Sequence, residues 1–325
     1  MHAQATTLSR AARWLTLWAA ALLLAGCGTL IPQTVALRTD WPQGVPRQVE
    51  LASVPFFPQD EYQCGPAALA MAMDYSGASI RPEALVDEVW LPSRHGSLQL
   101  EMLAAPRRHG LVSYRLAPSY TDVLREIAAG HPVVILQDAG LVFTQWHYAV
   151  VNGFDYATGT IYLRSGKQAR QEMPFSYFER TWRAGNYWAM VVLPPDRIAA
   201  TANEDRWMES LLGLARGDQP EATVTAYRTA LARWPDNLPA AVGLANHLHD
   251  QGKLDEAAGV LHAALQRHPD SVVLLNNLAQ TLSDQGRNAE ALFVIRRADA
   301  TQSPFASEIR ATRQLIEERL RSPGS

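Results

Sequence analysis

The pattern of apolar and polar positions divides the chain into two parts. In the first part, about residues 48–195, short helical patterns come first and apolar, β-rich runs follow. The predicted helices are 67–75, 82–89, 98–109, 120–129 and 175–182, and the predicted strands are 133–136, 147–154, 160–163 and 187–193. Helices followed by an antiparallel sheet predict an α+β domain.

The second part, residues 200–321, is helical throughout and repeats itself. Each recurrent pair lies 34 residues apart: Pro235 and Pro269, Leu244 and Leu278, Gly252 and Gly286, Glu256 and Glu290, Ala257 and Ala291. This is the period of the tetratricopeptide helix–turn–helix unit, so the pattern predicts an all-α solenoid. A degenerate earlier copy fits 204–234, and 303–321 is expected to form the capping helix.

The N-terminus has the features of an export signal. Arg10 and Arg13 precede a short apolar run, 14–24, and 24–27 reads Leu-Ala-Gly-Cys. This segment resembles the lipobox of bacterial lipoproteins, which implies a signal peptide over 1–26, lipid on Cys27 and a tether over 27–47. An ordinary secretory signal or an N-terminal anchor helix is the alternative.

Charge and composition exclude several classes of function. The formal net charge of the 325 residues is −3, which gives no indication of a nucleic-acid partner. The sequence contains no phosphate-binding glycine loop, no dinucleotide-binding pattern and no zinc-type spacing. His247 and His249 lie two apart on a predicted helix and make a poor metal pair. We therefore expect neither a metal nor a cofactor.

Cys64 is the candidate nucleophile. The chain has two cysteines, and lipidation of Cys27 would leave Cys64 without a disulfide partner. Cys64 stands where Gly65 and Pro66 open an apolar helix, and a helix N-terminus favours a thiolate over a thiol. The alternative is a small, buried apolar residue.

A cysteine nucleophile needs a base, and His147 is the best candidate. It begins an apolar strand and follows a polar, aromatic approach. His95, His109 and His131 are the other histidines of this part of the chain. His109 ends a helix, His131 precedes a proline in a turn, and His95 lies in a loop that could line a cleft.

Two blocks, 55–71 around Cys64 and 146–155 around His147, resemble the C39-type, papain-like cysteine peptidases. The chain is more closely similar to a bacterial lipoprotein branch of that family carrying tetratricopeptide repeats. The resemblance implies a papain-like α+β fold over 48–195, with Cys64 as nucleophile and His147 as general base. It also implies Gln59 as the side chain that stabilises the oxyanion, with Gln63 as the alternative.

The third member of the site departs from the family pattern. Relatives often carry Asp or Asn at the end of the next strand, where this chain has Ser165. A serine can orient the imidazole but cannot stabilise its charged form as a carboxylate does. Asn152 and Asp155 are nearer in sequence, but strand alternation leaves their direction open. The site is thus either a Cys–His dyad assisted by Ser165 or a weakened enzyme.

These features predict a membrane-anchored, periplasmic cysteine peptidase. Its expected partners are a peptide or protein substrate, a protein held in the groove of the repeats, and a membrane reached through the lipid anchor. The resemblance places it in the envelope of a Gram-negative bacterium, on the outer membrane facing the periplasm. One alternative is a weak or inactive papain-like scaffold that binds peptides. Another is a cell-wall peptide amidase or acyl transferase.

Overall fold

The computed structural model describes residues 31–59, 63–92, 96–140, 142–298 and 304–321. The signal peptide, Cys27, His95 and the first residue of the expected capping helix therefore lie outside the described residues. The chain forms two compact units: residues 1–102 with 115–192, and residues 103–114 with 193–325. The predicted boundaries at 195 and 200 stay predictions. Among the described residues, no helix has the length and apolarity needed to cross a bilayer.

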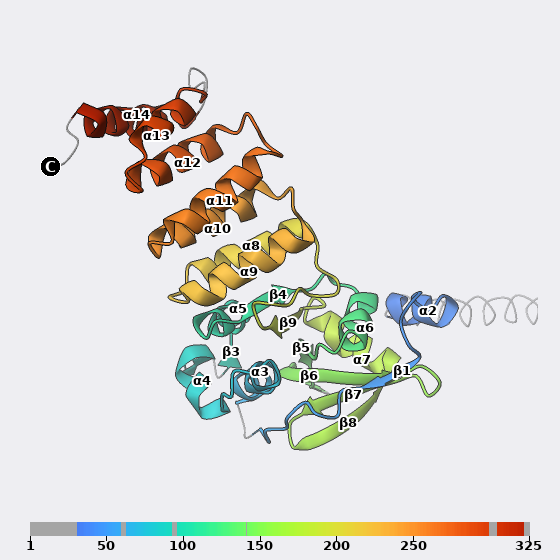
Figure 1. Cartoon of the computed structure of the whole chain (residues 1–325). Coiled ribbons are helices and arrows are strands. Elements are labelled where there is room, and N and C mark those ends of the chain that lie inside the picture. Colours follow the sequence, from blue (N-terminus) through green and yellow to red (C-terminus); the bar gives the residue numbers. More distant parts are fainter. Residues whose placement is uncertain (1–30, 60–62, 93–95, 141, 299–303, 322–325) are drawn as a thin grey trace, which may run out of the picture. The chain divides into compact units, whose positions relative to one another are not determined.

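An antiparallel sheet is the centre of the first part of the chain (Figure 1). Its strands are β1 (Gln48–Glu50), β4 (Val112–Arg115), β5 (Val133–Asp138), β6 (Trp146–Asp155), β7 (Thr160–Ser165), β8 (Gln168–Pro174) and β9 (Ala189–Leu193). The strand order is β4-β9-β5-β6-β7-β8, and β1 pairs with the C-terminal end of β6. A separate hairpin joins β2 (Trp90–Leu91) to β3 (Gly96–Ser97).

In the part of the chain that the structure describes, six helices accompany these strands. They are α2 (Pro32–Thr39), α3 (Cys64–Tyr75), α4 (Pro82–Val89), α5 (Gln99–Arg108), α6 (Tyr120–Ala128) and α7 (Phe175–Ala184). The predicted helix 82–89 is confirmed residue for residue. The capping role of Ser119 is also confirmed, because its Oγ accepts a hydrogen bond from the Asp122 N–H at 3.2 Å.

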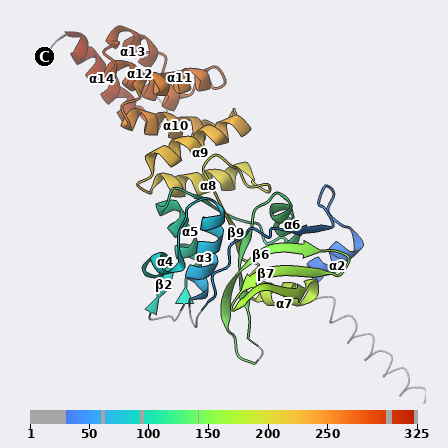
Figure 2. The same cartoon turned by 60° about the horizontal axis from the view of Figure 1, so that its bottom comes forward.

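Two of these helices cover opposite faces of the sheet (Figure 2). The helix α3 packs on β6, and on that face the Tyr148 hydroxyl donates to the Ser97 carbonyl in β3. His147, the preceding residue, points to the other face because side chains alternate along a strand. There the Thr181 hydroxyl of α7 donates to Gln137, which lies directly opposite His147 in β5.

The segment predicted as a tether contains a docked helix. In α2 the Thr34 and Leu37 side chains are buried. The carboxylate of Glu179, in α7, accepts hydrogen bonds from the N–H groups of Gln33 at 2.9 Å and Thr34 at 2.5 Å. A carboxylate at a helix N-terminus satisfies donors that the helix itself leaves free. Residues 32–39 are therefore part of the folded unit and not a free linker.

The second unit carries the predicted repeats (Figure 1). Its helices are α8 (Glu204–Ala215), α9 (Pro220–Arg233), α10 (Leu238–Asp250), α11 (Leu254–Leu265), α12 (Val272–Asp284), α13 (Asn288–Ile295) and α14 (Ala306–Arg321). The first helix of each pair is capped by Asn203, Asn237 or Ser271, which lie 34 residues apart. The shared cap shows that the degenerate copy keeps the same register.

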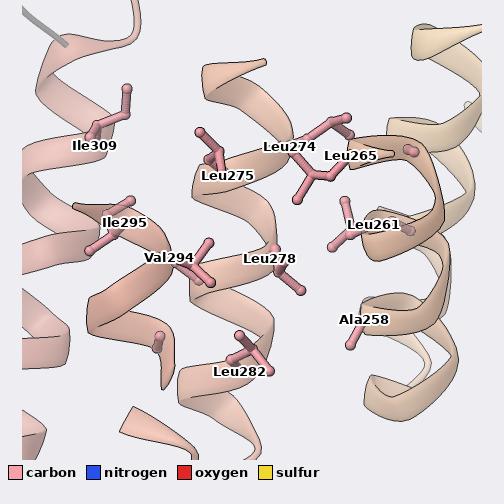
Figure 3. Packing of buried hydrophobic residues seen from close by; sticks show 14 of the residues in the cluster. Ala258, Leu261, Leu265, Leu274, Leu275, Leu278, Leu282, Val294, Ile295 and Ile309 are labelled. Atoms are coloured by element: carbon pink, nitrogen blue, oxygen red, sulfur yellow. The ribbon is translucent and has the colours of Figure 1, made fainter. Parts of the chain in front are cut away.

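Aliphatic side chains from α10 to α14 form the core of the repeats (Figure 3). Leu261, Leu275 and Leu278 lie at its centre, each about 1% exposed. Gly252 and Gly286 end the first helices of two repeats with φ values of +72° and +80°, a conformation that favours glycine. The predicted fold class, an α+β peptidase-like part followed by a tetratricopeptide solenoid, is confirmed.

Candidate active site

Cys64 is the first residue of α3 and is half-buried. Gly65, the next residue, lets β3 approach closely, because a Cβ on it would come within 2.1 Å of the Ser97 Oγ. The backbone N–H groups of Tyr148, Gly65 and Cys64 itself lie near the thiol and act to lower its pKa. The helix N-terminus therefore directs donors at the sulfur, as its position in the sequence predicts.

Strand geometry explains why the Tyr148 N–H is free to meet the thiol. Tyr148 lies opposite Leu136, and the Leu136 N–H donates to the Trp188 carbonyl, away from β6. In an antiparallel pair of this kind, both residues direct their backbone groups outward. The Tyr148 N–H therefore faces the β7 side, beyond the end of that strand. Cys64 is held there, beside the residue that follows His147.

His147 and Ser165 are brought together across 18 residues of sequence. His147 is the second residue of β6, Ser165 ends β7, and the Ser165 Oγ lies 3.0 Å from the His147 Nε2. A register shift between Leu163 and Ser165 marks this end of β7. Ser165 is buried and His147 is half-buried.

The two other candidates for orienting His147 are engaged elsewhere. The Asn152 amide donates to the Leu51 carbonyl at 3.3 Å, on the side of β1. The Asp155 carboxylate accepts the N–H groups of Ala157 and Thr158 in the β6–β7 turn. Of the three residues that the sequence left open, only Ser165 contacts the imidazole.

Gln59 is anchored at the same end of β7. Its N–H donates to the Gly166 carbonyl at 3.0 Å, and its Oε1 accepts the Gly166 N–H at 3.3 Å. The side chain is 6% exposed, and its Nε2 has no hydrogen-bond partner in the described part of the chain. Gln63 is exposed instead, at the cap of α3. The structure therefore favours Gln59 over Gln63 as a donor held ready for a ligand.

Burial shifts both reactive groups toward their neutral forms. It raises the pKa of the Cys64 thiol, and the backbone hydrogen bonds only partly offset this. It lowers the pKa of His147 from 6.5 to about 4. Within the described residues no hydrogen bond joins the Cys64 sulfur to the His147 ring. The helix N-terminus was expected to favour the thiolate, but desolvation outweighs it.

A pocket of about 270 Å³ opens beside the His147–Ser165 pair. It is lined by Gln137, Ala139, Gln145, His147, Ser165, Gln171, Met173, Tyr177 and Thr181. Cys64 is not among these residues, because its thiol faces the Tyr148 N–H at the edge of β6. The imidazole therefore stands between the thiol side of the strand and a polar pocket.

Two other histidines of the described residues have acidic partners elsewhere. The buried His131 ring contacts the Glu126 carboxylate at 2.7 Å, and His249 contacts Asp284 in the repeats. No group of acidic, histidine and cysteine residues in the described ranges could hold a metal ion. Sequence reasoning missed the roles of Tyr148 and Gly166. Gly166 has a φ of +56°, so a glycine directly after a strand was the available signal for a turn there.

Comparison with known proteins agrees with this architecture. Residues 51–190 match the Peptidase_C39 like family, and 214–272 and 248–315 match tetratricopeptide repeat families. No curated protein gave a significant match.

Two solved structures show local similarity. One is a candidate C39-like peptidase from Bacillus anthracis, with 19% identity, a TM-score of 0.40 and coverage of 46% of this chain and 98% of that one. The other is a double glycine motif protease from an AMS/PCAT transporter in complex with the leader peptide. Its identity is 23% and its TM-score 0.33, over 43% of this chain and 91% of that one. The chain thus combines a region of the Peptidase C39 like family with C-terminal tetratricopeptide repeats.

Proposed function

We propose that this protein is a thiol peptidase that hydrolyses peptide amide bonds with Cys64 as nucleophile and His147 as general base. The observation that carries the proposal is the convergence of four residues at one end of the sheet. The Cys64 thiol lies near the backbone of the residue that follows His147, and Ser165 contacts the imidazole. The side chain of Gln59 accepts a hydrogen bond from the Gly166 N–H.

The first step uses a neutral thiol and a neutral imidazole. The Nε2–H of His147 donates to the Ser165 Oγ, which leaves the Nδ1 lone pair as the base. When substrate binding brings the Cys64 thiol and the His147 ring together, Nδ1 takes the thiol proton as the sulfur attacks the carbonyl carbon. Catalytic hydrogen bonds often tighten only once the substrate is bound.

The oxyanion of the tetrahedral intermediate needs donors. The unpartnered Nε2 of Gln59 and the N–H of Cys64 are the two candidates. The protonated imidazole then gives its proton to the leaving nitrogen, and a thioester remains on Cys64. Water, deprotonated by His147, hydrolyses this thioester and restores the thiol.

The rest of the chain supplies location and recruitment in this proposal. Lipid on Cys27 would hold the protein on the outer membrane, facing the periplasm. The repeats would bind a protein partner or the substrate, since solenoids of this class present extended binding surfaces. Only four residues separate Cys27 from Pro32, where α2 begins, so the peptidase unit would be held close to the bilayer.

The test is peptide cleavage by the full chain and by three variants. Cys64→Ala should abolish turnover, and His147→Ala should lower kcat/KM by about a hundredfold to ten-thousandfold. Gln59→Ala should lower kcat by about a hundredfold or more, whereas Gln63→Ala should leave it nearly unchanged. Cleavage that survives Cys64→Ala would refute the proposal.

An inactive, peptide-binding fold is the second candidate. The serine at position 165 and the raised pKa of Cys64 both favour it. In that case peptides bind the full chain but no acyl-enzyme forms. Mass spectrometry after incubation with peptide esters separates the two candidates, because esters acylate a competent thiol readily. A mass increase that requires Cys64 and His147 supports the peptidase.

A further inference from the structure

The wall of the pocket beside His147 contains an unsatisfied polar group, which protein atoms cover and which would face a ligand only after the Gln171 amide turns toward the pocket. Gln171, on β8, lines the pocket, and its side-chain Oε1 is buried with no hydrogen-bond partner in the described part of the chain. Buried polar atoms are nearly always paired, because an unpaired one costs about 1–3 kcal/mol. An orphaned acceptor in a pocket wall therefore indicates a ligand that brings a donor.

Hydrogen bonds of the fold hold one polar side chain of the pocket wall and part of its backbone. Gln137 accepts a hydrogen bond from Thr181 at 3.1 Å, which ties β5 to α7. The Asp138 carboxylate accepts the N–H groups of Gly140 at 3.0 Å and Gln145 at 2.8 Å, which orders the backbone that carries Ala139 and Gln145. The wall is thus built before any ligand enters.

The lining selects against charged ligands. Apart from the neutral imidazole of His147, none of the lining residues is ionisable near neutral pH. A carboxylate or an ammonium group would enter without a counter-charge, and burying an unpaired charge is costly. An aliphatic side chain would leave the Gln171 acceptor unpaired. A neutral group with hydrogen-bond donors is the best match.

The volume of the pocket further limits the kind of ligand that it can bind. The volume, about 270 Å³, is below the range of about 300–1,000 Å³ typical of sites for drug-sized ligands. It suits a single side chain. A carboxamide carries both a donor and an acceptor, so it pairs with the amide of Gln171 in either orientation of that group.

We propose that this pocket is a specificity site that binds a carboxamide side chain, Gln or Asn, of the peptide substrate next to the scissile bond. The proposal rests on the proposed peptidase function, because His147 forms part of the wall. Gln171 is a specificity-determining residue in it. The pocket would bind one neutral polar side chain of the substrate, while the Cys64 thiol attacks the scissile bond on the other side of the imidazole.

A substrate series with a designed switch tests the proposal. The two residues on either side of the scissile bond are varied in turn among Gln, Leu, Glu and Lys. At one position kcat/KM should be about tenfold or more higher for Gln than for the other three. Gln171→Leu should remove that preference, and Gln171→Glu should move it to Lys. Gln48→Glu, an exposed change on β1, is the matched control and should leave the preference as in the wild type.

A binding measurement makes the test independent of turnover. Cys64→Ala is titrated with the N-acetyl N-methylamides of Gln, Glu and Leu while the His147 ring signals are followed by NMR. Only the Gln compound should shift them, and Gln171→Leu should abolish the shift. Selective binding without cleavage by the wild type would support the pocket and contradict the peptidase. Equal cleavage of Gln and Leu substrates at every position, or shifts of equal size with all three compounds, would overturn the pocket.

Discussion

At the scale of single residues, the chemistry of the site depends on what contacts the imidazole of His147. Ser165 supplies a hydroxyl at 3.0 Å from the Nε2, and a hydroxyl cannot stabilise a charged ring as a carboxylate does. Burial lowers the pKa of the ring to about 4. Both shifts favour the neutral forms of Cys64 and His147, so in the proposed mechanism the proton moves from the thiol to the ring during the attack.

Ser165→Asp should strengthen the base. A carboxylate next to Nε2 favours the charged ring, so the pKa of His147 should rise from about 4. The value of kcat should then increase, and the acid limb of the pH profile of kcat/KM should shift to higher pH. Ser165→Asn, which adds bulk without charge, is the control and should leave the acid limb in place. An unchanged limb in Ser165→Asp would mean that the residue at 165 does not act on His147.

The same lowered pKa makes the fold sensitive to acid. The unfolded chain protonates His147 near pH 6.5, whereas the folded chain does so near 4. The stabilising contribution is fully present above pH 6.5 and is lost as the pH falls to about 4. Its size is at most about 3.5 kcal/mol, since one pKa unit corresponds to about 1.4 kcal/mol.

Urea unfolding at pH 7 and pH 4.5 measures this contribution. His147→Gln lacks the titrating ring, so its free energy of unfolding should fall less between the two pH values than that of the wild type. His109→Gln provides a second histidine variant, outside the site, which should follow the wild type. Equal losses in the wild type and His147→Gln would contradict the lowered pKa.

At the scale of elements, the ends of strands and helices assemble the site. The start of α3, the start of β6 and the end of β7 meet, and a register shift precedes Ser165, which still pairs with Gln168 of β8. Local sequence patterns predicted α3 and β6, because apolar runs follow Cys64 and His147. The strand β8 had no such signal. Most of its residues are exposed and polar, so it shows no apolar alternation.

The docking of α2 is a second feature of this scale. Glu179 is fully buried, and its carboxylate caps a helix that the sequence suggested was a linker. Glu179→Ala would leave two N–H groups without acceptors. We expect a loss of about 3 kcal/mol in the free energy of unfolding and faster proteolysis between 31 and 47. Glu83→Ala, an exposed glutamate of α4, should change both much less. Unchanged proteolysis in Glu179→Ala would contradict this role.

At the scale of the whole molecule, the repeats make the second unit a stack in which each pair of helices contacts its neighbours. Leu278 is 1% exposed in the shared core, whereas Leu212 is 52% exposed on α8. Leu278→Ala should lower the free energy of unfolding of this unit by about 2–5 kcal/mol. Leu212→Ala should change it by less than about 0.5 kcal/mol. Comparable effects of the two changes would show that the core is placed wrongly.

The boundary between the two units does not fall at a single point in the sequence. Residues 103–114 cluster with the repeats, although they lie within the predicted peptidase region. Tyr114 shows why: its ring packs against Trp207 and its hydroxyl donates to the Thr201 carbonyl at 3.2 Å. Nothing in the periodicity of 98–109 indicates these long-range partners. A segment with an ordinary amphipathic pattern does not specify which core it will join.

The sequence by itself determined the repeat register, the fold class and the candidate residues Cys64, Gln59, His147 and Ser165. Period, capping residues and short motifs are local properties, and local patterns are enough to specify them. The tertiary structure decided the protonation preference of the site, the choice of Ser165 over Asn152 and Asp155, and the neutral pocket at Gln171. Each of these depends on burial and on contacts between segments distant in sequence, which follow only when the strands pair.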